Sequence, residues 1–142
     1  MVLALSGLLL AGRLLPEGEG RAVAWRDLTS QTGPLRIMRS DRRVFRERSK
    51  LARYLKGAHP GRSLPVVDFS TRQLLLVSTG PRSSTGYSVE VLSARERDGK
   101  ITVSVRERSP RVGEDVRPRV TYPYRLISLP AGREVYVDWH GR

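Results

Sequence analysis

The side chains that could make or break covalent bonds are few in this chain and stand far apart. The 142 residues include no cysteine and only two histidines, His59 and His140. Ser83 and Ser84 have no histidine near them in the sequence, and the order of histidines and aspartates fits no Ser-His-Asp triad. Asp68 has no second carboxyl group at a spacing that would tune it as a general base. We therefore predict no catalytic residues.

Metal and cofactor binding are not indicated either. Without cysteine, and with the histidines far apart, the sequence offers no recognisable ligand set for a metal ion. Gly80, Gly86 and Gly99 do not follow the spacing of a phosphate-binding loop. We predict no metal ion and no cofactor, and no small-molecule substrate is evident. Asp68 is instead expected to cap the turn that follows it.

The residues best suited to bind a partner lie in a loop between two predicted strands. Residues 80–87 include a rigid proline, an arginine, three hydroxyl side chains, a glycine suited to a bend and a tyrosine. Such loops on a rigid sheet commonly carry binding residues. Two tyrosines that flank Pro123 add an aromatic contact surface. The predicted partner-binding residues are Arg82, Ser83, Ser84, Thr85, Gly86, Tyr87, Tyr122 and Tyr124.

A purely structural interpretation of the same residues stays open. In that interpretation Gly86 only makes a bend, and Tyr87 fills the core beneath it. Tyr122 and Tyr124 would then lie across a sheet edge, with one ring buried and the other half-exposed.

The second half of the chain predicts strands that hold this loop. Residues 73–79 are short, apolar and bounded by turn residues, which is typical of a strand buried on both faces. Apolar residues alternate in 87–92 and again in 101–106, and Asp98-Gly99 between them is a type I′ hairpin signal. Later strands are expected at 120–124, 125–129 and 135–139, with Pro123 marking an edge or a bend, after a loop over 109–119.

The first half predicts one helix and two short strands. Residues 22–25 and 35–39 read as strands. Ser40 or Asp41 is expected to cap a helix that extends to about Lys56, with a 3.6-residue apolar stripe. The predicted fold is therefore α+β: a mostly antiparallel sheet of about six or seven strands with one main helix at about residues 41–56.

Residues 1–20 form an apolar N-terminal segment and a Gly- and Glu-rich spacer. The apolar run from Val2 to Ala11 is shorter than the roughly 20 residues that span a bilayer. It suits the hydrophobic part of a signal peptide, although no basic residues precede it. A translation start further upstream would supply them. We predict a signal-peptide or anchor remnant, hence an extracytoplasmic (secreted or membrane-tethered) protein, with residues 21–142 as a single domain. The alternative is a first element of the fold.

The net charge of +12 derives almost entirely from arginine. The arginines are spread along the chain and interleaved with acids, which favours a solvated surface. A nucleic-acid partner is the alternative, but aromatic residues are only 6% of the chain. Stacking platforms for bases are therefore not evident, and nucleic acid is not the expected partner.

Four motifs resemble those of the PrcB C-terminal domain family, over roughly residues 65–130. They are Val67-Asp68-Phe69-Ser70, Leu76-Val77-Ser78-Thr79-Gly80, Thr85-Gly86-Tyr87 and Tyr122-Pro123-Tyr124, followed by Leu129-Pro130. Family members often have two glycines where this chain has Thr85-Gly86. The family takes its name from an accessory subunit of a bacterial surface protease complex. The resemblance implies a non-catalytic binding or scaffolding module, with a protease as one conceivable partner.

The predicted function is that of a non-catalytic extracytoplasmic module that binds another protein. It would be an accessory or stabilising subunit of a protease-type complex. One alternative is a protease inhibitor that inserts the 80–87 loop into a cysteine-protease cleft, as chagasin-like inhibitors do. The other is a basic nucleic-acid-binding protein.

Overall fold

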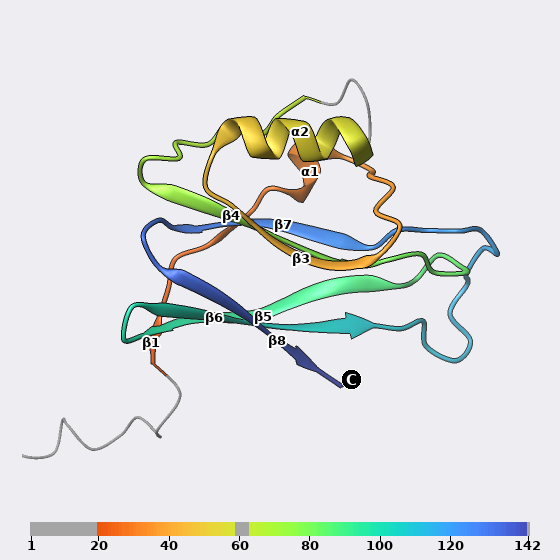
Figure 1. The fold of residues 1–142 in the computed structure, drawn as a ribbon. Coiled ribbons are helices and arrows are strands. Elements are labelled where there is room, and N and C mark those ends of the chain that lie inside the picture. Colours follow the sequence, from red (N-terminus) through yellow and green to blue (C-terminus); the bar gives the residue numbers. More distant parts are fainter. Residues whose placement is uncertain (1–19, 59–62, 142) are drawn as a thin grey trace, which may run out of the picture.

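The computed structural model describes residues 20–58 and 63–141, in which two β-sheets pack face to face and a helix covers the outer face of one of them (Figure 1). The predicted N-terminal segment lies, but for Gly20, outside the described residues. The elements are β1 (Arg21–Ala22), β2 (Arg26–Asp27), α1 (Thr29–Thr32), β3 (Ser40–Phe45), α2 (Arg48–Ala58), β4 (Arg72–Thr79), β5 (Ser88–Arg97), β6 (Lys100–Arg108), β7 (Tyr124–Pro130) and β8 (Glu134–His140).

Each sheet has four strands. Sheet A has the order β1-β5-β6-β8, and sheet B has the order β2-β7-β4-β3. All neighbouring strands are antiparallel except β6 and β8, which run parallel. The predicted α+β class, with mostly antiparallel strands and one main helix, is confirmed. The sequence pattern did not reveal that the strands divide between two sheets.

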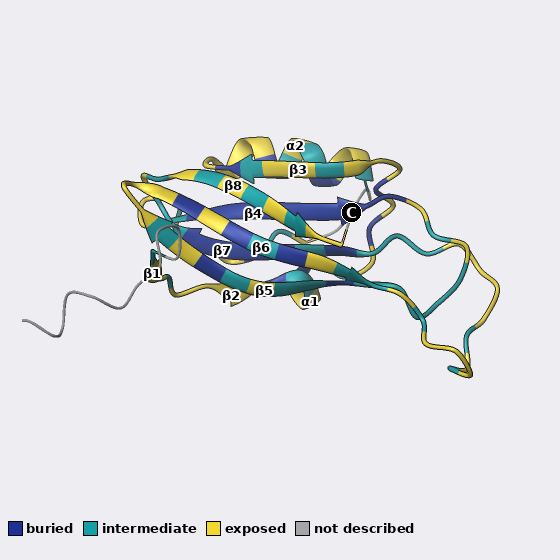
Figure 2. Cartoon of the chain, turned by 90° about the horizontal axis from the view of Figure 1, so that it is seen from below, coloured by how far each residue is buried: buried dark blue, intermediate teal, exposed yellow. Residues whose placement is uncertain are grey.

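Strand β4 connects the three layers, which are α2, sheet B and sheet A. It is a central strand of sheet B, and from Gln73 onward its residues are buried (Figure 2). Leu74 and Leu76 belong to the cluster under α2, whereas Leu75 and Val77 belong to the cluster between the sheets. The prediction of a strand buried on both faces is confirmed, because successive strand residues point to opposite sides of a sheet.

The hairpin between β5 and β6 also follows its sequence signal. Asp98 and Gly99 have φ angles of 52° and 74°, which is the left-handed conformation that a type I′ turn requires at both central positions. Arg97 pairs with Lys100 across this turn. The register shifts between Val91 and Ser93, where a bulge interrupts β5.

The predicted start of the main helix is wrong. Residues 40–45 form strand β3, and α2 begins only at Arg48 and ends at Ala58. Phe45 faces the same core cluster as Leu51 and Leu55 of the helix, so its apolar position matched the helical stripe although it belongs to a strand. The free edge of β4 needs a hydrogen-bonding partner, and this tertiary requirement overrides local helix propensity.

The two short strands predicted near the N-terminus are only partly confirmed. Residues 35–39 alternate as expected, with Leu35 and Ile37 buried, but they pair with no strand. The predicted strand at 22–25 is split, because the chain leaves sheet A after β1 and joins sheet B at β2 (Figure 1). Among the described residues, no helix combines the length and apolar character needed to cross a bilayer.

Candidate functional site

Two connections between the sheets lie side by side at one end of the molecule (Figures 1 and 2). One is the β4–β5 loop, residues 80–87, and the other is the β6–β7 loop, residues 109–123. We call them together the end loops. Both leave from the end where β4 and β6 finish and where β5 and β7 begin. They contain most of the predicted partner-binding residues.

Backbone hydrogen bonds join the two end loops. Arg82 and Thr121 exchange N–H···O bonds of 2.8 and 2.9 Å, and the amide of Thr85 donates to the carbonyl of Arg117 at 3.1 Å. Two hydroxyl groups add to this pairing. The Thr85 side chain accepts a bond from the Arg117 amide at 2.8 Å, and the Thr121 side chain donates to the Ser84 carbonyl at 2.8 Å. The loops therefore form one bonded unit.

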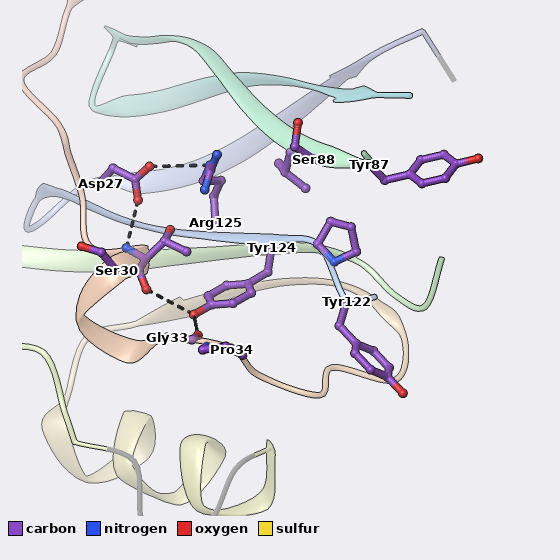
Figure 3. Close-up of a pocket in the computed structure, with 12 residues that line it drawn as sticks. Asp27, Ser30, Gly33, Pro34, Tyr87, Ser88, Tyr122, Tyr124 and Arg125 are labelled. Atoms are coloured by element: carbon purple, nitrogen blue, oxygen red, sulfur yellow. Dashed lines mark hydrogen bonds and ion pairs between the residues drawn. The ribbon is translucent and has the colours of Figure 1, made fainter. Parts of the chain in front are cut away.

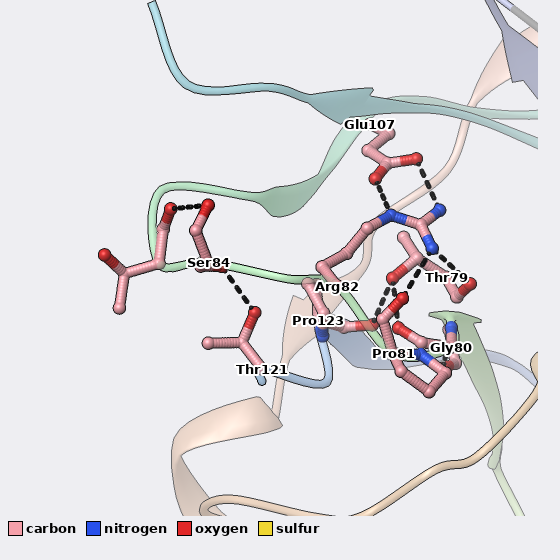
Figure 4. A network of polar contacts seen from close by, with 10 residues as sticks. Thr79, Gly80, Pro81, Arg82, Ser84, Glu107, Thr121 and Pro123 are labelled. Atoms are coloured by element: carbon pink, nitrogen blue, oxygen red, sulfur yellow. Dashed lines mark hydrogen bonds and ion pairs between the residues drawn. The ribbon is translucent and has the colours of Figure 1, made fainter. Parts of the chain in front are cut away.

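Arg82 anchors this unit to sheet A (Figure 4). Its guanidinium donates two bonds to the carboxylate of Glu107 on β6, of which the Nη2 to Oε2 bond is 2.9 Å long. It also donates to the carbonyls of Thr79 and Pro81, at 3.2 and 2.9 Å. The bonds to Glu107 raise the pKa of Arg82 above its ordinary value. Arg82 is therefore held inside the protein's own network.

Gly86 of the β4–β5 loop lies against the β6–β7 loop. Its φ angle is 95°, in the left-handed region that favours glycine. A β-carbon there would lie 2.9 Å from Pro110 Cγ and 2.9 Å from Val116 Cγ1. The predicted bend at Gly86 is confirmed. Glycine suits this position both because φ is positive and because a β-carbon would be too close to its neighbours.

Replacing Gly86 with alanine should lower the free energy of unfolding by about 1–2 kcal/mol, because it adds both backbone strain and a clash. Gly132→Ala is the matched control, since Gly132 has a φ angle of 78° but no atom within 4 Å of its added β-carbon. Urea denaturation measures both. Equal losses in the two variants would show that close packing of the end loops contributes nothing.

Tyr87 and Tyr122, one from each end loop, lie on the rim of one groove (Figure 3). The groove has a volume of about 640 Å³. Both rings are partly exposed, and in Figure 3 both point outward from the ribbon. Their exposed rings leave them available to a partner, so their role in binding stays a prediction.

Tyr124 has a different position at the floor of this groove. Its side chain is 7% exposed, and its hydroxyl bonds to Thr32 Oγ1 at 2.6 Å and donates to the Gly33 carbonyl. It thereby fixes α1 against β7. The prediction of one buried and one half-exposed ring in this pair is confirmed, and Tyr124 contributes mainly to stability.

The remaining walls of the groove come from β5, β7 and the α1 region. An ion pair of 3.6 Å joins Asp27 of β2 to Arg125 of β7, while Ser88 begins the β5 wall. β1 pairs with β5 only near Arg95 and Glu96. Within the described part of the chain, residues 88–93 of β5 therefore have no strand beside them on the side away from β6.

The structure thus divides the predicted site residues. Ser83 is exposed at the tip of the β4–β5 loop. The side chain of Thr85 instead bonds to the β6–β7 loop, and that of Arg82 bonds to Glu107 of β6. Sequence reasoning missed Glu107. This residue continues the alternation of inward-facing apolar residues along β6, so its side chain also faces inward. An inward acid beside a basic loop is the signal that could have identified this pair.

No three histidine or acidic side chains within residues 20–58 and 63–141 converge so as to hold a metal ion. Asp68 makes the predicted turn: its carboxylate accepts bonds from the Ser70 amide and hydroxyl, which lower the pKa of Asp68.

Comparison with protein families identifies the segment that builds the groove's outer rim. Residues 74–130 match the family model described as PrcB C-terminal. No curated protein and no solved structure matches the chain. The resemblance inferred from the sequence motifs is confirmed over this segment, although the motif at 67–70 falls outside it.

The PrcB C-terminal segment comprises nearly all of β4, the β5–β6 hairpin, β7 and both end loops. It contributes two strands to each sheet. It also contains all eight predicted partner-binding residues. The PrcB C-terminal family is not known as catalytic. The helix α2, β1–β3 and β8 lie beyond the matched segment.

Proposed function

We propose that this protein is a non-catalytic extracytoplasmic module that binds another protein, as an accessory or stabilising subunit of a protease-type complex. The observation that carries the proposal is the position of Tyr87 and Tyr122 on the rim of one groove, although they are far apart in sequence. Partly exposed tyrosines are typical anchors of protein interfaces, because they bury a large apolar ring and keep a polar hydroxyl.

The edge of β5 supplies a mode of binding. Residues 88–93 have hydrogen-bonding groups directed away from β6, and no described strand lies beside them. An extended segment of a partner can add there as a further strand, since main-chain bonds give affinity and neighbouring pockets give specificity. Tyr87, at the start of this edge, would then contact the partner's side chains. The end loops give the groove a fixed shape, which reduces the entropy lost on binding.

The test is loss of partner capture when both tyrosines are replaced. The full chain and its Tyr87→Ser/Tyr122→Ser variant are immobilised and exposed to cell-envelope extract of the encoding organism, and retained proteins are identified by mass spectrometry. We expect one partner to be retained by the parent and at least tenfold less by the variant. The matched control is Tyr136→Ser, which removes a tyrosine that is 50% exposed on the outer face of sheet A. Equal retention by all three proteins would refute the groove as the binding site.

The inhibitor alternative requires a loop that enters a protease cleft on its own. Here the β4–β5 loop is hydrogen-bonded along its length to the β6–β7 loop, which favours a broad contact surface. We expect no inhibition of papain at micromolar concentration of the full chain. Inhibition that is lost on replacement of Ser83 and Ser84 would support the inhibitor alternative instead.

A further inference from the structure

The positive charge of the chain is concentrated around α2 and the segments next to it. Residues 36–58 include only two acids, Asp41 and Glu47. The same stretch holds nine of the 26 arginines and lysines: Arg36, Arg39, Arg42, Arg43, Arg46, Arg48, Lys50, Arg53 and Lys56. Cations therefore outnumber acids by nine to two in this stretch.

Five of these cations gather around one aromatic ring. Two shallow hollows, of about 450 and 360 Å³, flank Tyr54, and Arg53 lines both of them. Arg43 and Lys50 line the first hollow, and Arg36 and Arg39 line the second. We call this surface the basic face. It lies on the helix-covered side of sheet B (Figure 1).

Little negative charge offsets the basic face. Among its cations, only Arg43 has an ion pair with a described acid, at 2.6 Å from Asp41. Burial, assisted by the charge of Asp41, raises the pKa of Tyr54 to about 12, so this hydroxyl is neutral at physiological pH. On sheet A, by contrast, Glu96 bonds to both Arg21 and Arg133.

The single exposed apolar side chain on this surface distinguishes between anionic partners. Met38 is 64% exposed and lines the second hollow between Arg36 and Arg39. A flexible apolar side chain can enter the headgroup region of a bilayer while neighbouring arginines contact phosphates. A single-stranded nucleic acid would instead be held partly by stacking of its bases on exposed rings. Tyr54 is half-buried and packs against Phe45, with ring centres 5.4 Å apart.

We propose that the basic face docks on a membrane surface rich in anionic phospholipid, with Met38 inserted among the headgroups. The cations supply the attraction, since each basic residue near an anionic bilayer adds to binding. Five cations and one apolar side chain give a reversible, salt-sensitive association. This inference does not rest on the proposed groove, because none of these five cations lines it.

The test is flotation of the full chain with vesicles of phosphatidylglycerol and phosphatidylcholine, compared with vesicles of phosphatidylcholine alone. The decisive variant is Arg39→Gln/Lys50→Gln/Arg53→Gln. Its matched control is Arg95→Gln/Arg97→Gln/Lys100→Gln. This variant also removes two arginines and one lysine, but from another exposed hollow, on sheet A. We expect at least tenfold weaker binding to anionic vesicles for the first variant, and less than threefold for the control. Residues 1–19 are the same in all these proteins, so any contribution they make to vesicle binding is equal. Binding to the neutral vesicles measures that contribution.

Met38→Ser provides the second measurement. We expect it to weaken binding to anionic vesicles severalfold while leaving the weaker binding to a duplex DNA oligonucleotide unchanged. Equal losses in the two triple variants would overturn the proposal, because net charge alone would then explain the binding. Tighter binding to DNA than to vesicles, lost in the first triple variant and indifferent to Met38→Ser, would assign the basic face to nucleic acid and overturn it as well.

Discussion

Replacement of Leu76 with alanine should lower the free energy of unfolding by about 3 kcal/mol. The Leu76 side chain is 0% exposed and belongs to the cluster that joins sheet B to α2. Removing a fully buried leucine loses transfer free energy and leaves a cavity, and such changes cost about 2–5 kcal/mol. β4 is bonded on both sides, to β3 and β7, so the backbone cannot shift to fill the space.

Leu92→Ala is the control for this prediction. Leu92 lies in the bulge of β5 and is 42% exposed, so the same change should cost less than about 1 kcal/mol. Urea denaturation followed by circular dichroism measures both variants. The slope of the unfolding free energy against urea concentration should be unchanged. A loss at Leu76 no greater than that at Leu92 would contradict the three-layer packing described above.

Replacement of Arg82 with methionine should lower the free energy of unfolding by about 2 kcal/mol. The change leaves the Glu107 carboxylate without the arginine that pairs with it, and removes the bonds to the carbonyls of Thr79 and Pro81. Losing one partner of a buried pair costs about 3–5 kcal/mol. The expected value is smaller because the Arg82 and Glu107 side chains are 26% and 17% exposed and water screens part of the charge.

Arg106→Met tests whether the effect belongs to this position. Arg106 pairs with Glu90 at 2.7 Å, but its side chain is 56% exposed, and such surface pairs contribute about 0–1 kcal/mol. In the double variant Arg82→Met/Glu107→Gln, part of the lost stability should return, since the charge of Glu107 is removed together with the arginine that pairs with it. Thermal or urea unfolding of the parent, of Arg82→Met, of Glu107→Gln and of their double variant gives the coupling between the two side chains. If the two single arginine variants behave alike, Arg82 is not an internal anchor, and a binding role for its side chain regains support.

Local signals of turns and burial were predictable from sequence. Asp98-Gly99 has a left-handed preference that does not depend on the rest of the chain, and the short apolar run of 74–77 between turn residues favours a fully covered strand. Phe45 shows where such reasoning fails. Its apolar position suits both a helical stripe and a strand facing α2, and only the unpaired edge of β4 decides between them.

The groove could be predicted only in part. Tyr87 and Tyr122 were both named from their residue type and their loops, but their meeting depends on the arrangement of two sheets. Alternation along a strand shows that one face is buried without showing what covers it. The ion pair of Arg82 could not be predicted either, because it depends on the position of β6. From sequence alone, an arginine in a loop is expected to be solvated unless an inward-facing acid is known to lie beneath it.

The parallel pairing of β6 with β8 has a consequence for how the protein is made. β7 intervenes between these strands in the chain but lies in the opposite sheet, so the chain crosses the molecule twice before sheet A is complete. Long-range contacts of this kind form late, because distant parts of the polypeptide must meet first. During synthesis on the ribosome, the edge of β6 therefore lacks its partner strand until β8 has been made. A nascent chain in that state is a natural client for chaperones and proteases.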